Sequence, residues 1–435
     1  MHDLVIRGGD IEVAIEGEYI AEVGSDLPAG PTEMDATGLT IFPGLVDVHV
    51  HFNEPGRADW EGAETGSRAF AAGGGTTFID MPLNSTPCTL NGAEFDRKAA
   101  ALNASSITDF ALWGGLVPGS AGEMDKLAER GVVGFKAFMC NSGLPEFPRS
   151  DDLTLFEGMR TAARLGLPVA VHAENEEITA GLTRRLIEEG RNDIAAFLES
   201  RPVVAEVEAI RRAGFFARQT GCRLHVVHIS SGSGIAAALE ARALGADVSI
   251  ETCPHYLFFT EDDLYRIGAL AKCAPPLRSR EERDSLWQAV LASEVDIVGS
   301  DHSPCPPAMK ERSSFFEIWG GIAGIQTTLP SLIHLGLSPE RIAKVTATNG
   351  ARRFGLAMKG AIQPGLHADL ALVDVNAVCD IREETLLHRH RASPYVGAKL
   401  RGVVRKTLRR GELIYSDGVV MAGSRGRLIR PSKGK

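Results

Sequence analysis

The sequence predicts an α/β protein, a (β/α)8 TIM barrel with a small β-sandwich domain formed from both chain ends. Three observations predict this fold. Eight short apolar segments alternate with longer segments of helical pattern through the middle of the chain, and both ends carry short strand-like segments instead. The length of 435 residues suits one large domain and a smaller one. An open doubly wound sheet is the alternative, but no G-x-G-x-x-G follows an early strand.

The eight segments expected to form the barrel are rich in Val, Leu, Ile and Phe, as buried parallel strands are. They are 44–52, 76–83, 107–116, 132–139, 168–174, 222–230, 246–257 and 296–304. Helices are expected in the gaps, for instance 151–166, 179–218 (more than one helix), 233–244 and 280–293. The run Gly73-Gly74-Gly75 precedes a strand, which indicates the end of a helix rather than a phosphate-binding loop.

The two ends of the chain resemble each other. Short strand patterns such as DLVIRGGD and DLALVDVN occur in both, and the termini of a chain often lie close together. We therefore expect residues 1–43 and 366–435 to form a composite β-sandwich domain, and residues 44–365 to form the barrel. The last residues, GSRGRLIRPSKGK, are basic and polar, which predicts a solvated tail.

Composition excludes several classes of function. The formal net charge is −10, which disfavours a nucleic acid or an anionic membrane as partner. The seven cysteines are scattered and include no C-x-x-C, which argues against a disulfide framework or a zinc knuckle and favours a reducing cytoplasm. The sequence shows neither the apolar core of a signal peptide nor a stretch able to span a bilayer. We expect a cytoplasmic protein.

The most informative motif is His49-Val50-His51, at the end of an apolar strand. Side chains two apart on a strand share a face, so the two imidazoles can hold one metal ion. An ordinary pair of surface histidines is the alternative. The strand is Val- and Leu-rich and followed by Asn53-Glu54-Pro55-Gly56, so it is expected to be buried, where polar side chains need partners.

Other polar side chains stand near the carboxyl ends of predicted strands, where barrels of this kind place their active residues. They are Lys136, His172, His228 and Asp301. Each alone has a simpler explanation: a core histidine, a helix cap, or a lysine that reaches the rim. With the histidine pair they supply six donors, and since one ion needs fewer, two ions sharing a bridging oxygen are expected.

Two neighbouring histidines are expected to face away from this site. His225 lies an odd number of residues before His228, so in a regular strand it would pack against the helices. Asp301 and His302 are adjacent, so only one of them faces the barrel. The carboxylate is the better hard ligand and proton carrier, so we expect Asp301 to be that one.

A buried lysine costs free energy unless it is paired, neutralised or modified. The amine of Lys136 can react with carbon dioxide to give a carbamate, N6-carboxylysine, whose oxygens could bridge two ions. A pair of ions lowers the pKa of bound water and polarises a carbonyl. Asp301 is then expected to take the proton from the nucleophilic water and deliver it to the leaving nitrogen.

These motifs resemble the cyclic amidohydrolases of the amidohydrolase superfamily. The runs that fit, in order, are PGLVDVHVHF, GFKAF, VHAE, HVVHIS, ETCPHYL, KCAPPLR, DHSP and GLHADLALVD. The resemblance implies a centre of two divalent ions, with Zn2+ expected, and a hydroxide between them that attacks a cyclic amide. It implies that His49, His51 and Asp301 hold one ion, that His172 and His228 hold the other, and that carboxylated Lys136 bridges them. It also implies a homo-oligomer, a tetramer.

Within that family, the loops favour the branch that hydrolyses allantoin to allantoate, in purine catabolism. Dihydroorotases usually carry an arginine for the substrate carboxylate where this chain has Asn53, and allantoin has no carboxylate. Dihydroorotase, or hydantoinase and dihydropyrimidinase, with the same centre is the alternative. The resemblance implies these contacts to a small cyclic amide or ureide: Asn53, Asn84, Ser142, Gly320 and Gly321. Turn chemistry also explains Asn and Gly at such positions.

Two further hypotheses belong to other classes. Cys140 and Cys305 lie near predicted strand ends and could act as thiol nucleophiles, although core packing explains them equally. Alternatively, the barrel could serve as a scaffold without chemistry. Scaffold relatives lose metal ligands, whereas this chain keeps all six candidates.

Overall fold

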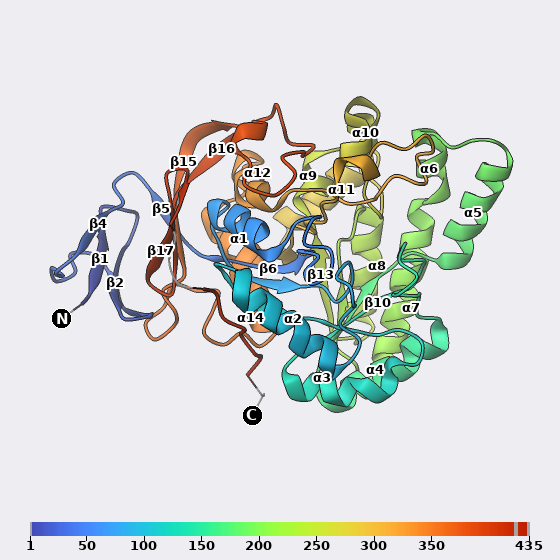
Figure 1. Cartoon of the computed structure of the whole chain (residues 1–435), viewed down its shortest axis with the longest axis horizontal. Helices are drawn as coiled ribbons and strands as arrows, with labels where there is room; N and C mark the ends of the chain where they lie inside the picture. Colours follow the sequence, from blue (N-terminus) through green and yellow to red (C-terminus); the bar gives the residue numbers. More distant parts are fainter. Residues whose placement is uncertain (1, 422–424, 433–435) are drawn as a thin grey trace.

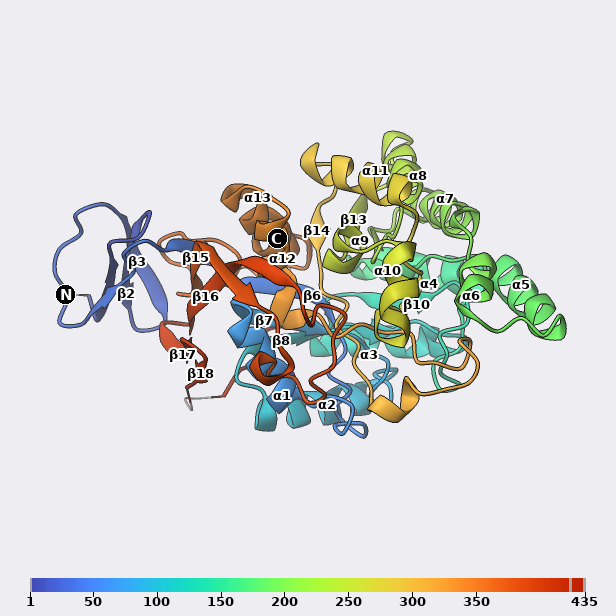
Figure 2. The same ribbon diagram turned by 90° about the horizontal axis from the view of Figure 1, so that it is seen from above.

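The computed structural model describes residues 2–421 and 425–432. A strand-rich part containing the N-terminus lies beside a larger part in which helices surround a parallel sheet, as Figure 1 shows from one side and Figure 2 from above. Together they confirm the predicted barrel with an accompanying β domain. Within the described ranges, no helix is long and apolar enough to cross a membrane.

The barrel has eight staves, and each contains residues of one predicted strand segment. They are β6 (Leu45–Val50), β7 (Gly75–Asp80), β8 (Asp109–Leu112) continued by β9 (Gly114–Gly115), β10 (Phe135–Phe138), β11 (Val169–His172), β12 (Leu224–Val226), β13 (Val248–Thr252) and β14 (Ile297–Val298). Successive staves pair in parallel. The ring closes beyond β14, where the His51 amide donates to the His302 carbonyl at 2.8 Å.

The predicted helices are present with similar ends. They are α4 (Asp152–Leu165), α8 (Gly232–Ala243) and α11 (Arg280–Leu291), and the expected stretch 179–218 corresponds to three helices that extend slightly beyond it: α5 (Glu176–Glu188), α6 (Ile194–Ser200) and α7 (Val203–Thr220). The breaks have local causes, since Gly190 has a φ of 74° and Pro202 precedes the first turn of α7. Gly73 caps α1 (Ala63–Ala72), as expected of the glycine run.

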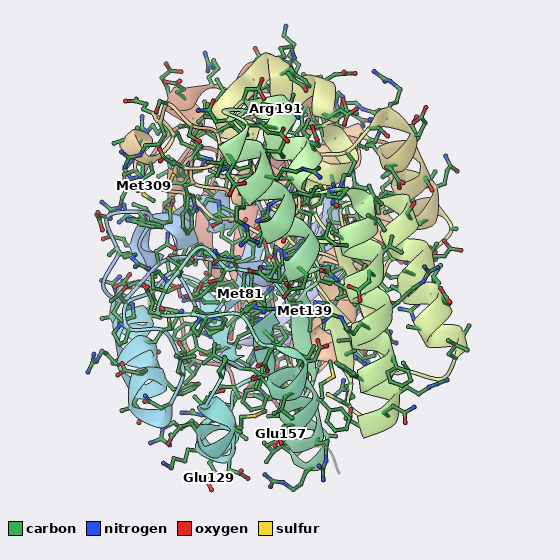
Figure 3. The ribbon with its side chains drawn as sticks, turned by 90° about the vertical axis from the view of Figure 1, so that its right-hand side faces the viewer. Met81, Glu129, Met139, Glu157, Arg191 and Met309 are labelled. Atoms are coloured by element: carbon green, nitrogen blue, oxygen red, sulfur yellow. The ribbon has the colours of Figure 1, made fainter. Side chains whose placement is uncertain are left out.

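The remaining helices cover the barrel or connect its staves. They are α2 (Gly92–Ser105), α3 (Met124–Arg130), α9 (Pro254–Phe258), α10 (Glu261–Ile267), α12 (Thr328–His334), α13 (Pro339–Ala343) and α14 (Asn349–Arg353). In Figure 3 the labelled Met81 and Met139, which follow β7 and β10, lie in the middle of the molecule. Arg191 and Met309 lie towards one end of that view, and Glu129 lies at the other.

The β domain consists of two sheets. One has the order β3-β2-β1-β4 and the other the order β18-β17-β16-β15-β5. The strands are β1 (Leu4–Arg7), β2 (Glu12–Glu16), β3 (Tyr19–Gly24), β4 (Glu33–Asp35), β5 (Thr40–Pro43), β15 (Leu370–Asp380), β16 (Lys399–Arg409), β17 (Glu412–Ser416) and β18 (Val419–Val420). The antiparallel pairing of β5 with β15 joins the two ends of the chain. A shared apolar core, including Ile6, Ile41 and Leu408, holds the sheets together.

A buried ionic cluster connects the β domain to the barrel. Lys359 donates to Asp109 on β8 and to Asp369 just before β15, at 2.6 Å each, and Arg410 pairs with Asp109. Burial alone would raise the pKa of Asp109, but the two cations together hold it below its ordinary value. These charges are compensated within the protein, which is how buried ions are tolerated.

The prediction of a solvated tail is only partly correct for residues 425–432: Arg425, Arg427, Arg430 and Ser432 are exposed, but the backbone of the segment is bonded to the barrel. The Phe110 amide donates to the Arg427 carbonyl, and the Ile429 amide donates to the Phe110 carbonyl. The Arg427 amide also donates to Asp109. The tail therefore follows β8 as a short parallel bridge, because the free edge groups of that strand offer backbone partners that a composition argument does not reveal. The other predicted tail residues lie outside the described ranges.

Apolar side chains fill the inside of the barrel on the amino-terminal side of the histidines. Val46, Val48, Ile79 and Ala111 form this layer with Trp113, whose indole N–H donates to the Val48 carbonyl at 3.0 Å. All five are buried. This packed layer supports the polar side chains at the carboxyl ends of the strands and closes the barrel beneath them.

Candidate active site

Three of the predicted donors meet where the barrel closes. The Nε2 atoms of His49 and His51 each lie 3.3 Å from Oδ1 of Asp301, which follows β14. All three are almost fully buried. His49 and His51 are two residues apart and both face inward, and the register irregularity between Asp47 and Val50 lets them share the inner side with Val46 and Val48 below them. Two imidazoles and a carboxylate around one point form a donor group suited to a divalent ion.

A second pair of donors lies beside the first group. His172 ends β11, and its Nδ1 lies 3.1 Å from Nε2 of His228, which follows β12. The ring centres of His228 and His49 are 5.3 Å apart, so the two groups adjoin. The structure therefore brings together, from four staves, five of the six side chains that the sequence singled out.

The sixth, Lys136, lies on β10 and is wholly buried. Its Nζ has no hydrogen-bond partner among the described residues. Burial lowers the pKa of this amine to about 8, although Asp301 and Glu251 oppose the shift. Lys136 thus does not extend to the solvent at the rim. A buried amine without a partner fits the expected modification, because a carbamate would replace a costly unpaired donor with oxygens able to bind ions.

The backbone at two of these donors is strained. Asp301 has a φ of 44° and His228 a φ of 39°, in the left-handed region that residues with a Cβ seldom adopt. Such conformations persist where the surrounding structure imposes them, and they cluster at functional sites. In both cases the turn ends the strand and directs the side chain towards the centre.

The expectation that His225 packs against the helices is wrong. Its Nδ1 lies 2.8 Å from Ser249 Oγ, its Nε2 lies 2.8 Å from Glu251 Oε2, and its ring stacks beside the interior Trp113. Only a regular strand as far as His228 would place His225 on the helix side. The strand instead ends at Val226, so the odd spacing does not set the two histidines on opposite faces.

His302 does face away from the donors. Its Nδ1 accepts from the Gly324 amide at 3.2 Å, and its Nε2 lies 3.4 Å from Oε2 of the buried Glu61. The ring is therefore held between the loop before α12 and the loop before α1. Asp301, the adjacent residue, is left to face the histidine pair.

Buried carboxylates behind the histidines were missed in the sequence. Glu174 Oε2 lies 2.7 Å from His172 Nε2, and Glu251 Oε1 lies 2.8 Å from His49 Nδ1. Asp47 accepts from the His49 amide at 3.1 Å. The available signal was the same period of two that revealed the histidine pair, because Glu174 is two residues after His172 and Asp47 two before His49.

The donors lie at the bottom of a cavity of about 720 Å³. Of the expected substrate contacts, Asn84, Ser142 and Gly320 line it, whereas Asn53 and Gly321 are not part of its lining. The side-chain Nδ2 of Asn53 lies 3.5 Å from the Pro304 carbonyl oxygen. A Cβ at Gly321 would lie 2.2 Å from the Ser303 carbonyl oxygen. These two residues support the loop that follows Asp301.

One wall of the cavity is formed by the segment 315–320, which has no regular structure and is held by the buried Lys272 and the half-buried Lys310. Lys272 Nζ donates to the Phe315 and Ile318 carbonyls at 2.6 and 2.5 Å, and Lys310 Nζ donates to the Trp319 carbonyl at 2.9 Å. Burial lowers the pKa of Lys272 to about 7 and that of Lys310 to about 8. Side-chain amines thus replace the backbone donors that a strand or helix would give this wall.

Neither candidate thiol suits a nucleophile. Burial raises the pKa of Cys140 to about 12 and also raises that of Cys305. A reactive cysteine needs a lowered pKa and access to solvent, and both side chains are buried. The arrangement favours chemistry at the group of histidines and Asp301.

Comparison with known proteins agrees with this geometry. Residues 40–414 match the model of the amidohydrolase family. An allantoinase of Solibacter usitatus is 58% identical over 99% of this chain and 97% of its own, and one of Rubrobacter xylanophilus is 53% identical over 100% and 98%. The solved L-hydantoinase (dihydropyrimidinase) of Arthrobacter aurescens has a TM-score of 0.96 and 32% identity, covering 99% of this chain and 100% of that one. The similarity thus includes both the β domain and the barrel.

Proposed function

The chain belongs to the amidohydrolase family, and from that premise we propose that it hydrolyses the cyclic amide bond of allantoin to give allantoate. The family is metal-dependent, and the donor groups described above could hold an ion. The observation that carries the choice of substrate is the similarity, over the full length, to proteins named allantoinase. The neutral Asn53, where a dihydroorotate-binding site would need a cation, supports the same choice.

The proposed centre holds two divalent ions, with Zn2+ as the expected metal. His49, His51 and Asp301 would hold one ion, His172 and His228 the other, and Lys136, carboxylated at Nζ, would lie between them. The 3.3 Å and 3.1 Å approaches of donor atoms within each group support this division, as does the unpartnered Nζ. Two imidazole nitrogens at such a distance are compatible where an ion or a proton lies between them.

When bound, two such ions supply a water of lowered pKa and polarise a carbonyl group. The protein's part is to place the ring and to move a proton. Burial alone would raise the pKa of Asp301, but His49 and His51 hold it well below its usual range, so the side chain is ionised at neutral pH. Asp301 accepts the proton of the attacking water and returns it to the ring nitrogen as the carbon–nitrogen bond breaks.

The rest of the cavity would recognise the ureide. The Asn84 side chain, 3.4 Å from Ser303 Oγ, lies on the lining and offers both a donor and an acceptor. The backbone at Gly320 and the hydroxyl of Ser142 are further proposed contacts, while Asn53 and Gly321, which lie outside the lining, would support the loop that follows Asp301. Ser142 Oγ donates to the Phe147 carbonyl at 2.6 Å and accepts from the Leu144 amide at 3.2 Å, so one acceptor position of the hydroxyl remains for a ligand.

Steady-state assays of the Zn2+-loaded protein with three substrate classes test this proposal. Allantoin should give the highest kcat/KM, ahead of dihydroorotate and 5-substituted hydantoins. Faster turnover of dihydroorotate would overturn the choice of substrate, while faster turnover of a hydantoin would favour the activity for which the similar L-hydantoinase is named. A scaffold without chemistry would hold no stoichiometric metal, which elemental analysis of the purified protein detects directly.

We also propose that the protein acts in the cytoplasm as a homotetramer. Exposed apolar side chains on neighbouring helices support self-association, namely Leu153 on α4 with Val204 and Phe215 on α7. Light scattering at micromolar concentration tests the tetramer, and a monomeric mass would overturn it.

A further inference from the structure

Glu251 lies on β13 with none of its side chain exposed, and both of its oxygens are used. Oε1 lies 2.8 Å from His49 Nδ1 and accepts from the His228 amide at 3.1 Å, while Oε2 lies 2.8 Å from His225 Nε2. One carboxylate therefore contacts a side chain of the first donor group and the main chain of the second. No comparable bridge is formed by Glu174, which bonds His172 and Arg201.

The bond to His49 determines which ring nitrogen can bind an ion. Oε1 of Glu251 lies 2.8 Å from His49 Nδ1, the arrangement in which a metal-binding imidazole donates its other ring N–H to a carboxylate. His49 Nδ1 must then carry the proton. The lone pair is left on Nε2, the atom that lies 3.3 Å from Asp301.

The bond to His228 acts on the backbone. His228 has a φ of 39°, and this conformation aims its Nε2 at Nδ1 of His172. In that conformation its amide has left the regular ladder of the sheet, and the partner it finds is Glu251 Oε1. Glu251 thus stabilises the turn that brings the second donor group together.

We infer that Glu251 is a positioning residue shared by both halves of the proposed two-ion centre, so that its loss weakens both ions, whereas the loss of Glu174 weakens the one held by His172. The inference rests on the proposed function only for the existence of two ions. Mutation of a residue that is hydrogen-bonded to a metal-binding histidine typically lowers the metal affinity by about 10–100-fold.

The matched pair Glu251→Gln and Glu174→Gln tests it in the full-length protein. Each variant is loaded with Zn2+, equilibrated with increasing chelator, and analysed for retained metal. In Glu251→Gln both ions should be released at about 10–100-fold lower chelator strength than in the wild type, and in Glu174→Gln only one ion should be. With Co2+ in place of Zn2+, the visible absorption spectrum reports on each bound ion. Relative to the wild type, the bands of both ions should change in Glu251→Gln, and the bands of one ion should change in Glu174→Gln.

Glu251→Asp keeps the charge on a shorter side chain, so it should recover part of the affinity for both ions. If Glu251→Gln does not fold, Glu251→Asp carries the test, and both of its ions should still be weaker than in the wild type. Retention of both ions with an unchanged Co2+ spectrum, or loss of one ion only, would overturn the shared role. A wild type without stoichiometric metal would instead overturn the proposed centre itself, and this inference with it.

Discussion

His172 Nδ1 and His228 Nε2 face each other at 3.1 Å, although the two residues are 56 positions apart in the chain. His172 Nε2 is already bonded to Glu174, so Nδ1 is the nitrogen left for another partner. Two imidazole nitrogens cannot both present lone pairs to each other without a proton or a cation between them. The pair is therefore poised to bind an ion.

Asp301→Asn should lower kcat on allantoin by about 10²–10⁴-fold, because the amide cannot accept the proton of the attacking water. The near-identical shape of the side chain keeps the turn at Asp301, so the variant should fold. Steady-state kinetics with metal analysis check this. Wild-type turnover by a fully metal-loaded Asp301→Asn protein would contradict the role.

Cys305→Ala and Cys140→Ala should keep most of the activity, within about threefold, because both thiols are protonated and buried. The measurement is kcat/KM on allantoin. A loss comparable to that of Asp301→Asn in either variant would favour thiol catalysis instead.

Lys136→Met should abolish stoichiometric binding of two ions and most of the activity, while leaving the metal-free protein at least as stable as the metal-free wild type. Methionine fills a similar volume and removes a buried amine that has no hydrogen-bond partner in the described part of the chain. Thermal unfolding in the presence of chelator, alongside elemental analysis, measures both effects. Two ions retained by the variant would refute a bridging role for this lysine.

Lys310→Met should raise KM for allantoin about tenfold with a smaller effect on kcat, because the wall formed by 315–320 would lose one of its two lysine anchors while Asp301 is untouched. The exposed Lys126→Met is the matched control and should change neither constant. An unchanged KM would show that the wall is held by other contacts.

Lys359→Met should destabilise the protein by about 3–5 kcal/mol, because it leaves Asp109 and Asp369 as buried charges with less compensation. Urea unfolding measures the change, and the exposed Lys344→Met serves as its control. A change below about 1 kcal/mol would mean that the cluster adds little net stability.

The same cluster gives a pH dependence. The folded protein lowers the pKa of Asp109, so its ionisation contributes stability that is complete above the unfolded value of about 3.9 and is lost as the pH falls through the lower folded value. Urea unfolding between pH 6 and 3 should show this loss in the wild type. In Lys359→Met the acid slope should be smaller, because less of the shift remains.

Much of this architecture could be predicted because it follows from local patterns. The eight apolar segments located every stave, and the polar residues at their ends located the donors. What the sequence does not show depends on departures from regular geometry. The φ of His228 ended the alternation on which the argument about His225 relied, and the bridge between the tail and Phe110 depends on a strand edge that is distant in the chain.

The buried carboxylates that hydrogen-bond to the donor histidines were also not predicted from the sequence motifs. Glu174 follows His172 at the same period of two that revealed the histidine pair, whereas the partner of Glu251, His49, is fixed only once the staves are side by side. Asn84 and Ser142 were identified by resemblance, and both line the cavity, while Asn53 and Gly321 lie outside its lining.

The pairing of β5 with β15 has a consequence for how the molecule is made. On the ribosome, Thr40–Pro43 of β5 emerge long before Leu370–Val373 of β15. Strand β5 therefore stays unpaired until nearly the whole polypeptide has been translated. The N-terminal hairpin of β2 and β3 can fold early, since its contacts are local. A nascent chain stalled before Leu370 would thus expose the unpaired backbone groups of β5, which can pair with other chains. Such truncated products should depend on chaperones to stay in solution.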